Sequence, residues 1–321
     1  VLDFKDKQPY LRLIEMNNIL ISIKNVSKVY KENKKALHNF SLEIYQNEVI
    51  GIIGPNGAGK TTLLKIILGL IFPTEGEVFV NGMTNRSNEV KKMIGYLPEY
   101  TVFPDFMTAE QFLEFHGCLY GIKGKVLNEK MRTVLEITGM SDYANHKMKT
   151  FSKGMVQRIY LSQALLNDPD ILILDEPTTG LDPIGIVEFR NLVLELKREG
   201  KTIIISSHLL SELEKICDRF AFILKGKLRK VIESAQFKGN KNIVEIEIDK
   251  PSEKLILYLR QKYEFSQDGC IFIFNIPRPG FTELLKDILD NQGEIISVNQ
   301  TEPSLEKIFV DFTSEDENDN I

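Results

Sequence analysis

The stretch 54–62 combines the residue types that bind the phosphates of a nucleotide. It reads Gly-Pro-Asn-Gly-Ala-Gly-Lys-Thr-Thr and fits the pattern G-x-x-x-x-G-K-[ST]. Its glycines allow backbone turns that a Cβ would prevent, and they bring N–H groups close to phosphate oxygens. The lysine offers a mobile charge to the β and γ phosphates, and the next threonine offers a hydroxyl to Mg²⁺. The candidate binding residues are Gly54, Asn56, Gly57, Ala58, Gly59, Lys60, Thr61 and Thr62.

The segments on both sides of this stretch have the order that a phosphate site needs. The apolar run 49–53 predicts a buried strand, and the apolar segment 63–70 predicts a helix. The N-terminus of that helix would add the positive end of its dipole. Strand, glycine-rich loop and helix in this order favour a phosphate site over a glycine-rich turn that contains a lysine by chance.

Two carboxylates follow a second apolar strand. The run 171–174 is wholly apolar, which is typical of a buried parallel strand, and it leads directly into Asp175 and Glu176. Open α/β sheets bind ligands at this end of their strands. Because a phosphate loop is also present, we favour a functional pair over a solvated loop pair. A third predicted buried strand, 202–206, leads to His208. A single histidine is usually structural, but its position at the end of a strand favours a functional role for His208.

Two further residues are candidates for contact with a nucleotide. Ser152 precedes a predicted helix that ends near residue 166, where it is a good N-cap, and the N-terminus of that helix is a second possible anion site. Tyr30 ends the first predicted strand. Its ring can stack on a base or pack at the strand end, and position alone does not decide between these roles.

The composition describes a globular chain with a full core. Of 321 residues, 43% are hydrophobic and 26% are charged, and the net charge of −5 gives no reason to expect a nucleic-acid partner. No apolar run reaches the roughly 18–20 residues that span a bilayer, and no signal peptide is visible. The three cysteines are far apart and odd in number, which favours reduced thiols over disulfides or a zinc site.

The chain divides into two predicted domains with flanking segments. We expect a main domain over 16–233, with strands at 19–29 and 36–45 and a helical insert over about 100–150. In that insert Phe112, Phe115 and Leu119 recur at helical spacing, and we expect its aromatic residues in the core. A linker, 234–241, leads to a small βαβαβα domain over 242–312. Residues 1–15 form an extension that we expect to be poorly ordered, and the acidic tail 313–321 is expected to be disordered.

The order of these motifs resembles the ATPase domain of ABC transporters, over residues 16–233. The stretch 54–61 is similar to the Walker A loop, and 171–176 to the Walker B strand. By the same resemblance Tyr30 matches the aromatic residue that stacks on adenine, and residues 97–99 match the Q-loop. The remaining matches are the signature motif at 151–155 with Ser152 and Gly154, the D-loop with Asp182, and the switch histidine His208.

The chain departs from the family pattern at three positions. Lys153 replaces the first glycine of Leu-Ser-Gly-Gly-Gln, Met155 replaces its glutamine, and Glu99 replaces the glutamine of the Q-loop. A carboxylate can bind Mg²⁺ or accept a hydrogen bond from water, but it cannot donate a hydrogen bond when it is ionised. These changes, and the segment 303–309, resemble ATPase subunits that pair with separately encoded ABC-2-type permeases.

The resemblance implies a fold and a mechanism. The fold would be α/β, a P-loop NTPase of the ABC ATPase type with an antiparallel β subdomain and a helical insert, followed by a small α+β domain. ATP and Mg²⁺ would bind in a head-to-tail homodimer or heterodimer, with Ser152 and Gly154 facing the partner's γ-phosphate. The implied roles are Mg²⁺ binding by Thr61, Glu99 and Asp175, activation of water by Glu176, and stabilisation of transition-state charge by Lys60 and His208.

The resemblance also implies where the chain works. It would lie on the cytoplasmic face of a membrane and power an integral permease, as an exporter. Phe103, Phe106 and Met107 are candidates for the permease contact, and their alternative is the core of the helical insert. The identity of the transported substrate is not encoded here.

Three other functions remain to be weighed. One is a soluble ABC ATPase that acts on ribosomes or DNA, but only one phosphate loop and no heptad run are present. Another is a regulatory subunit that binds ATP and hydrolyses it weakly. The departures from the family pattern at Lys153 and Glu99 are compatible with this alternative. A GTPase or kinase lacks support, because no Asn-Lys-x-Asp motif occurs and the signature stretch would stay unexplained.

Overall fold

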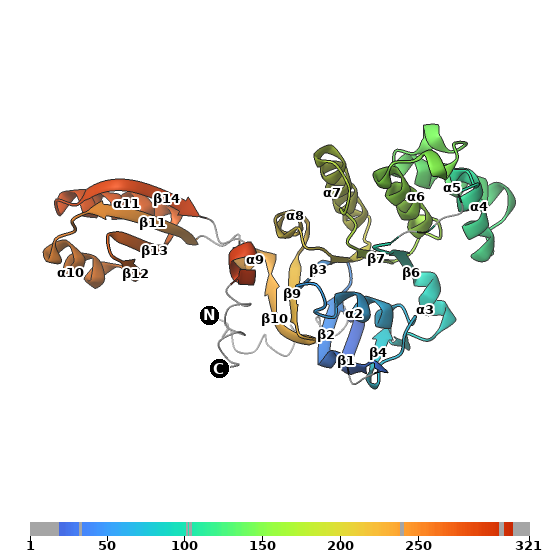
Figure 1. Cartoon of the computed structure of the whole chain (residues 1–321), viewed down its shortest axis with the longest axis horizontal. Coiled ribbons are helices and arrows are strands. Elements are labelled where there is room, and N and C mark those ends of the chain that lie inside the picture. Colours follow the sequence, from blue (N-terminus) through green and yellow to red (C-terminus); the bar gives the residue numbers. More distant parts are fainter. Residues whose placement is uncertain are drawn as a thin grey trace, which may run out of the picture. The chain divides into compact units, whose positions relative to one another are not determined.

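The computed structural model describes residues 19–31, 34–100, 102, 105–237, 241–301 and 305–310. These residues form two compact units that divide between Ile232 and Glu233 (Figure 1). The predicted extension 1–15 and the acidic tail 313–321 lie outside the described residues. None of the described helices is both long enough and apolar enough to span a membrane.

A four-stranded antiparallel sheet forms one layer of the first unit, which confirms the predicted antiparallel subdomain. Its order is β2-β1-β4-β5, with β1 at Ile19–Val29, β2 at Lys35–Tyr45, β4 at Glu75–Val80 and β5 at Met83–Thr84. Asn81 and Gly82 join β4 to β5 with positive φ angles of 48° and 72°. Asn-Gly favours this geometry because both residues tolerate the left-handed region.

The second sheet has six strands and carries the predicted site at one edge. Its order is β10-β9-β3-β8-β7-β6, and β3 pairs in parallel with β8 and β9, as β7 does with β6 and β8. The strands β3, β7 and β8 are buried at every residue, as expected for strands covered on both faces. Their bounds are β3 Val49–Ile53, β6 Ile94–Leu97, β7 Ile171–Asp175, β8 Thr202–Ser206, β9 Arg219–Leu224 and β10 Lys227–Glu233.

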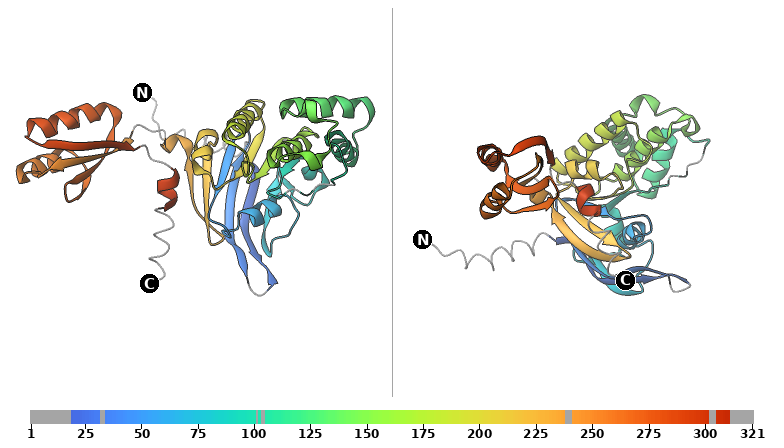
Figure 2. Two further views of the ribbon diagram at one scale, coloured as in Figure 1. Left: turned by 45° about the horizontal axis from the view of Figure 1, so that its top comes forward. Right: turned by 60° about the vertical axis from the view of Figure 1, so that its left-hand side comes forward.

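Helices connect and cover these strands, and their start signals are local. Thr108 forms a capping box with Gln111 at the start of α4, Ser152 caps α6, and Asp182 caps α7 directly before a proline. The helices α4, α5 and α6 gather as one helical group (Figure 2). The bounds are α2 Lys60–Ile67, α3 Asn88–Met93, α4 Ala109–Leu119, α5 Gly124–Ile137, α6 Lys153–Leu165, α7 Pro183–Arg198, α8 Leu210–Ile216 and α9 Ser234–Phe237, with 3₁₀ turns η3 Ser141–Tyr143 and η4 Met148–Thr150.

The predicted core of the helical insert is partly wrong. Phe112 is buried, but the second aromatic residue, Phe115, is 51% exposed. The buried stripe of α4 runs through Ala109, Phe112, Leu113 and Gly117, and Phe115 lies to one side of it. Helical spacing alone therefore placed in the core a residue that lies at the edge of the buried stripe.

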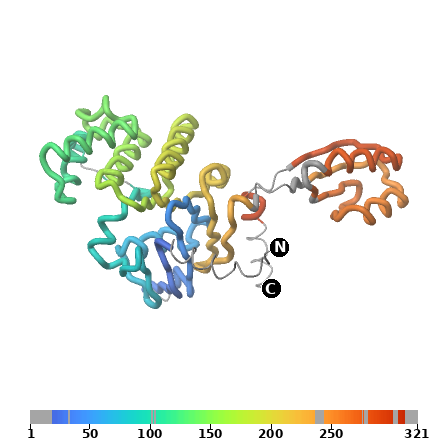
Figure 3. Tube along the Cα trace, turned by 180° about the vertical axis from the view of Figure 1, so that it is seen from behind, coloured from blue at the N-terminus to red at the C-terminus, as the bar shows by residue number. Residues whose placement is uncertain are grey.

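The second unit is a sheet covered by two helices. Its strand order is β12-β13-β11-β14, all pairs are antiparallel, and the chain order β-α-β-β-α-β is that of ferredoxin-like domains. Alternate residues of β11 and β13 form one core with leucines of both α10 and α11, so both helices lie on the same face. Figure 3 follows the chain path within each unit. The bounds are β11 Lys241–Asp249, α10 Glu253–Lys262, β12 Phe265–Asp268, β13 Ile271–Pro277, α11 Arg278–Asp290 and β14 Glu294–Thr301.

Two sequence predictions for this region need correction. The predicted βαβαβα order omits β12, whose four residues, Phe-Ser-Gln-Asp, are mostly polar and exposed. The predicted linker 234–241 contains the short helix α9 at its start, and β11 begins at its last residue. The final predicted helix is present over residues 305–310.

Candidate active site

The glycine-rich stretch forms a loop between β3 and α2 that only glycine can complete. Gly57 and Gly59 have φ angles of 80° and 109°, in the left-handed region. A Cβ on Gly59 would lie 2.5 Å from the Ala36 carbonyl oxygen, and one on Gly54 would lie 2.3 Å from the Ile223 carbonyl oxygen. The loop is thus clamped between β2 and β9, which fixes its backbone against the start of α2.

Lys60 lies inside this loop. Its ammonium group donates to the Gly54 carbonyl at 2.6 Å and to the Pro55 carbonyl at 3.3 Å, and the side chain is buried. The lysine also borders the open cleft in front of the loop. A cation held at this point can bind the phosphates of a nucleotide without a large movement of its stem.

Four parallel strands deliver the remaining candidates to one edge of the sheet. The phosphate loop follows β3, Glu99 follows β6, Glu176 follows β7 and His208 follows β8. Because these strands pair in parallel, their carboxyl ends lie side by side. Segments up to 150 residues apart in the sequence therefore meet at one place, as in other open α/β sheets.

Asp175 is a buried carboxylate with one free oxygen. The Ser206 hydroxyl, from the paired residue of β8, donates to its Oδ1 at 2.5 Å. Its Oδ2 has no hydrogen bond of good geometry among the described residues, although the Thr61 hydroxyl lies near enough to lower the carboxyl pKa. Burial nevertheless raises the pKa of Asp175, and the negative charges of Glu99 and Glu176 raise it further.

These oxygens fit a magnesium ion. Mg²⁺ prefers oxygen ligands, and it is commonly held by one or two carboxylates together with phosphates of the substrate. The Thr61 side chain and the Glu99 carboxylate line the cleft, and both Asp175 and Glu99 are near enough to Tyr96 that their charges, together with burial, raise its pKa to about 12. The described residues contain no cluster of three or more acidic, histidine or cysteine ligands, so phosphate oxygens and water would complete the shell.

Glu176 and His208 form a pair at the cleft. Glu176 has a φ angle of 50°, which is strained for a residue with a side chain, and it is only 8% exposed. Its backbone N–H donates to the Ser206 carbonyl at 3.0 Å. Its Oε2 lies 2.6 Å from His208 Nδ1 and accepts from the His208 backbone N–H at 3.3 Å. The arrangement aims one carboxylate at the cleft and fixes the imidazole beside it.

The cleft has a volume of about 760 Å³ and brings most of the predicted residues together. Tyr30 is one of the residues that line it, and the Lys28 ammonium lies 5.3 Å from the centroid of its ring. The other predicted residues that line the cleft are Asn56, Gly57, Gly59, Lys60, Thr61, Thr62, Glu99, Glu176 and His208. A cleft lined by an aromatic ring, a phosphate loop and carboxylates has the side chains that a nucleotide site needs.

Six of the predicted residues do not line this cleft: Gly54, Ala58 and Asp175, which are buried, and Ser152, Gly154 and Asp182 at two helix starts. The Ser152 hydroxyl accepts from the Met155 N–H at 3.3 Å at the start of α6, and Asp182 accepts from the Gly185 N–H at 2.8 Å at the start of α7. Gly154 packs near Leu181. The side chain of Lys153 covers Gly180, where an added Cβ would lie 2.5 Å from the lysine Cδ. These residues form a separate group around the starts of α6 and α7.

Sequence reasoning missed several residues of the cleft. Lys34, Lys35, Tyr100 and Thr179 line it, and no spacing rule singles them out. Ser206, whose hydroxyl donates to Asp175, had a detectable signal, because it is the polar residue that directly follows the apolar run 203–205. Cys118 and Cys270 are exposed and Cys217 is buried.

Known proteins are similar to this chain in sequence and in architecture. Residues 37–179 match the family model described as ABC transporter. The chain is 35% identical over 299 residues to an uncharacterized ABC transporter ATP-binding protein of Nostoc sp., covering 91% of this chain and 89% of the relative. It is also 35% identical over 300 residues to the bacitracin transport ATP-binding protein BcrA of Bacillus licheniformis, covering 91% and 96%. A dimeric, post-hydrolysis structure of the ATP-binding cassette MJ0796, bound to ADP and Pi, matches with a TM-score of 0.62 and 27% identity, covering 67% of this chain and 99% of that one.

Proposed function

The chain belongs to the ABC transporter family as an ATP-binding, ATP-hydrolysing subunit, and from this premise we propose that it powers a separate membrane permease. The observation that supports this most is the shared edge of β3, β6, β7 and β8, where the phosphate loop, Glu99, Glu176 and His208 meet in one cleft. ATP would lie with its base on Tyr30 and its β and γ phosphates at Lys60.

The carboxylates divide into two proposed roles, metal binding and activation of water. Asp175, Thr61 and Glu99 would hold Mg²⁺, which when bound neutralises charge on the phosphate oxygens. Glu176 would orient the attacking water and take its proton, because its carboxylate faces the cleft. His208, fixed at 2.6 Å from that carboxylate, would contact the γ-phosphate and stabilise charge in the transition state.

Hydrolysis would require two copies of the cassette. Ser152 and Gly154 lie at the start of α6 and do not line the chain's own cleft, so they are available to a second subunit. The N-terminus of this thirteen-residue helix favours an anion. MJ0796 was solved as a dimer, which supports the same assembly here as a homodimer or heterodimer. ATP would then supply contacts that exist only in the closed state and shift the equilibrium toward it.

The permease would dock beside the Q-loop on the cytoplasmic face of the membrane. Tyr100, Val102 and Phe106 are exposed, and Phe106 at 72% exposure is not part of the core of the helical insert. Met107 is half-buried, and Phe103 lies outside the described residues. We propose export as the direction of transport, in line with the relative named for bacitracin transport.

A regulatory subunit with weak hydrolysis is the second candidate. The observation that favours a regulatory subunit is Glu99, which adds a negative charge near Asp175, where the phosphates of ATP would bind. Multi-turnover phosphate release from the purified protein distinguishes the two functions, since a regulatory subunit would release little.

Affinity purification from membranes tests the proposed partner. The expected result is an integral membrane protein that stays bound and stimulates ATP hydrolysis. A Phe106→Glu variant should lose this partner but retain ATP binding. If the protein hydrolyses ATP and no membrane protein is retained, the transport role is wrong.

A further inference from the structure

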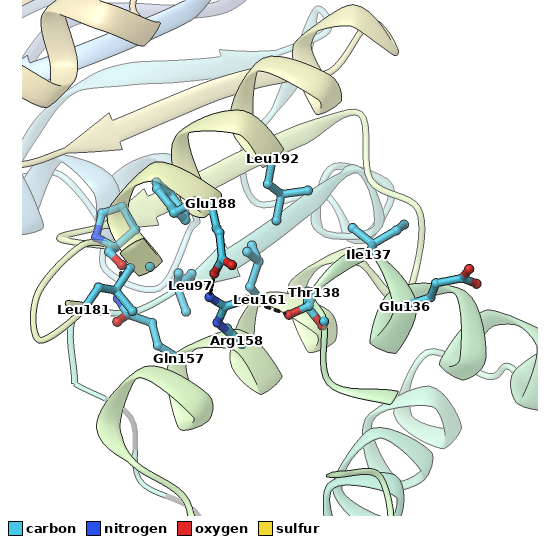
Figure 4. A pocket seen from close by; sticks show the side chains of 14 residues that line it. Leu97, Glu136, Ile137, Thr138, Gln157, Arg158, Leu161, Leu181, Glu188 and Leu192 are labelled. Carbon is cyan, nitrogen blue, oxygen red and sulfur yellow. Dashed lines mark hydrogen bonds and ion pairs between the residues drawn. The ribbon is translucent and has the colours of Figure 1, made fainter. Parts of the chain in front are cut away.

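A second cavity, of about 250 Å³, lies between α6 and α7 (Figure 4). Its walls come from the end of α5, from α6 and from α7, together with Leu97 at the end of β6 and Pro177 after the Asp175–Glu176 pair. It shares no lining residue with the nucleotide cleft. The catalytic scheme proposed above therefore leaves this cavity unexplained.

Polar bridges hold the two sides of the cavity together. The Arg158 guanidinium pairs with the Glu188 carboxylate of α7 and donates to the Thr138 carbonyl at 3.2 Å (Figure 4). The Gln157 amide donates to the Pro177 carbonyl. The backbone of α6 packs mainly on β6 and α5. The contact between α6 and α7 therefore depends on these polar bridges and on whatever occupies the cavity.

The cavity has the size and lining of a site for a small molecule. Apolar side chains form most of its walls, including Leu161, Phe189 and Leu192. Its volume equals that of roughly eight water molecules, which suits one ring with a short side chain. The pocket is thus small, largely apolar and provided with a few polar groups, as ligand sites commonly are.

The polar groups of the lining favour a cation. Arg158, the one cation of the lining, is already paired with Glu188, and the exposed carboxylate of Glu136 lies apart from the other lining side chains (Figure 4). The Oε1 of Gln157 is buried without a hydrogen-bond partner among the described residues, and such an acceptor is stabilised by a donor. An ammonium group donates hydrogen bonds to such an acceptor and carries no acceptor of its own, whereas a carboxylate could only accept.

We propose that this cavity binds a small aromatic primary amine. Its ring lies among Leu161, Phe189 and Leu192, and its ammonium group is held by Glu188 and Gln157. An occupant would restrain α6 against α7. Since α6 begins next to Ser152 and α7 begins next to Asp182, this restraint would slow turnover and leave ATP affinity unchanged. Only this effect on turnover depends on the proposed function; binding itself does not.

Calorimetric titration of the full chain with phenethylamine, without nucleotide, tests the site. We expect saturable millimolar binding, and much weaker binding of 3-phenylpropionate, which has the same ring and the opposite charge. Leu192→Phe should fill the cavity and weaken amine binding by about tenfold. Val187→Phe, on the exposed side of the same helix, is the matched control and should bind as the wild type does.

Each outcome decides a separate part of the proposal. Absence of saturable amine binding overturns the site, and equal binding of the carboxylate overturns the preference for a cation. Unchanged binding by a Leu192→Phe protein that still binds ATP overturns the location. Should that variant fail to fold, Glu188→Gln replaces it, and full amine affinity in Glu188→Gln counts against the proposed ammonium contact. Amine binding without slower ATP turnover overturns the regulatory effect alone.

Discussion

Replacing Glu176 by glutamine removes one carboxylate and little else. The side chain keeps its size, and the hydrogen bond from its backbone N–H to Ser206 is unaffected. An amide oxygen can still accept from His208, so the change replaces a charge-assisted hydrogen bond by a neutral one, a difference of about 1 kcal/mol or less for this partly exposed pair. We therefore expect a folded protein that binds ATP normally.

The effect on hydrolysis should be far larger. Loss of a positioned base typically lowers the rate by about 10²–10⁴-fold, or about 2.7–5.5 kcal/mol in the barrier. Phosphate release at saturating ATP measures the rate, and a nucleotide titration measures affinity. Glu195→Gln, an exposed position on α7, is the matched control and should retain full activity. Hydrolysis within about threefold of the wild type in Glu176→Gln would refute the assigned role of Glu176.

Three further changes test other parts of the site. Lys60→Ala deletes the buried cation of the phosphate loop and should abolish tight ATP binding, whereas unchanged affinity in a fluorescence titration would contradict the phosphate-loop interpretation. Asp175→Asn should raise the melting temperature of the nucleotide-free protein at pH 7, because burial raises the pKa of Asp175 and the ionised carboxylate therefore destabilises the fold. The gain in melting temperature should disappear as the pH falls below the ordinary carboxyl pKa. A gain that does not depend on pH would argue against this cause. Truncation after Ser234 should leave ATP binding intact, since every lining residue of the cleft lies in the first unit, and a folded fragment that cannot bind ATP would refute this separation.

Local sequence signals predicted the phosphate loop and the strands that flank it. Gly54, Gly57 and Gly59 are spaced for one loop, and the buried run before them has the composition of a central strand. The ends of β7 and β8 could also be identified, because an apolar run stops at a polar residue in each. These features depend on residues that are close in the sequence, which is why they could be predicted.

Features that depend on tertiary packing were missed. Lys34 and Lys35 line the cleft only because β2 passes next to the phosphate loop. The strand β12 carries too few apolar residues to show an alternating pattern, and it is held by its pairing with β13. The exposure of Phe115 follows from which face of α4 meets the rest of the insert. The pairing of α6 with α7 through Arg158 and Glu188 likewise has no local signature.

The claim that each active site is shared by two subunits can be tested by mixing two inactive variants. Ser152→Arg places a bulky cation at the start of α6 but leaves its own cleft intact, and Glu176→Gln has the opposite defect. A heterodimer of the two contains one site with both an intact cleft and an intact Ser152. Shared sites predict that the mixture releases phosphate much faster than the two variants do separately. A mixture that is no more active than the sum of its parts, or a Ser152→Arg protein that is fully active alone, would contradict the dimer mechanism.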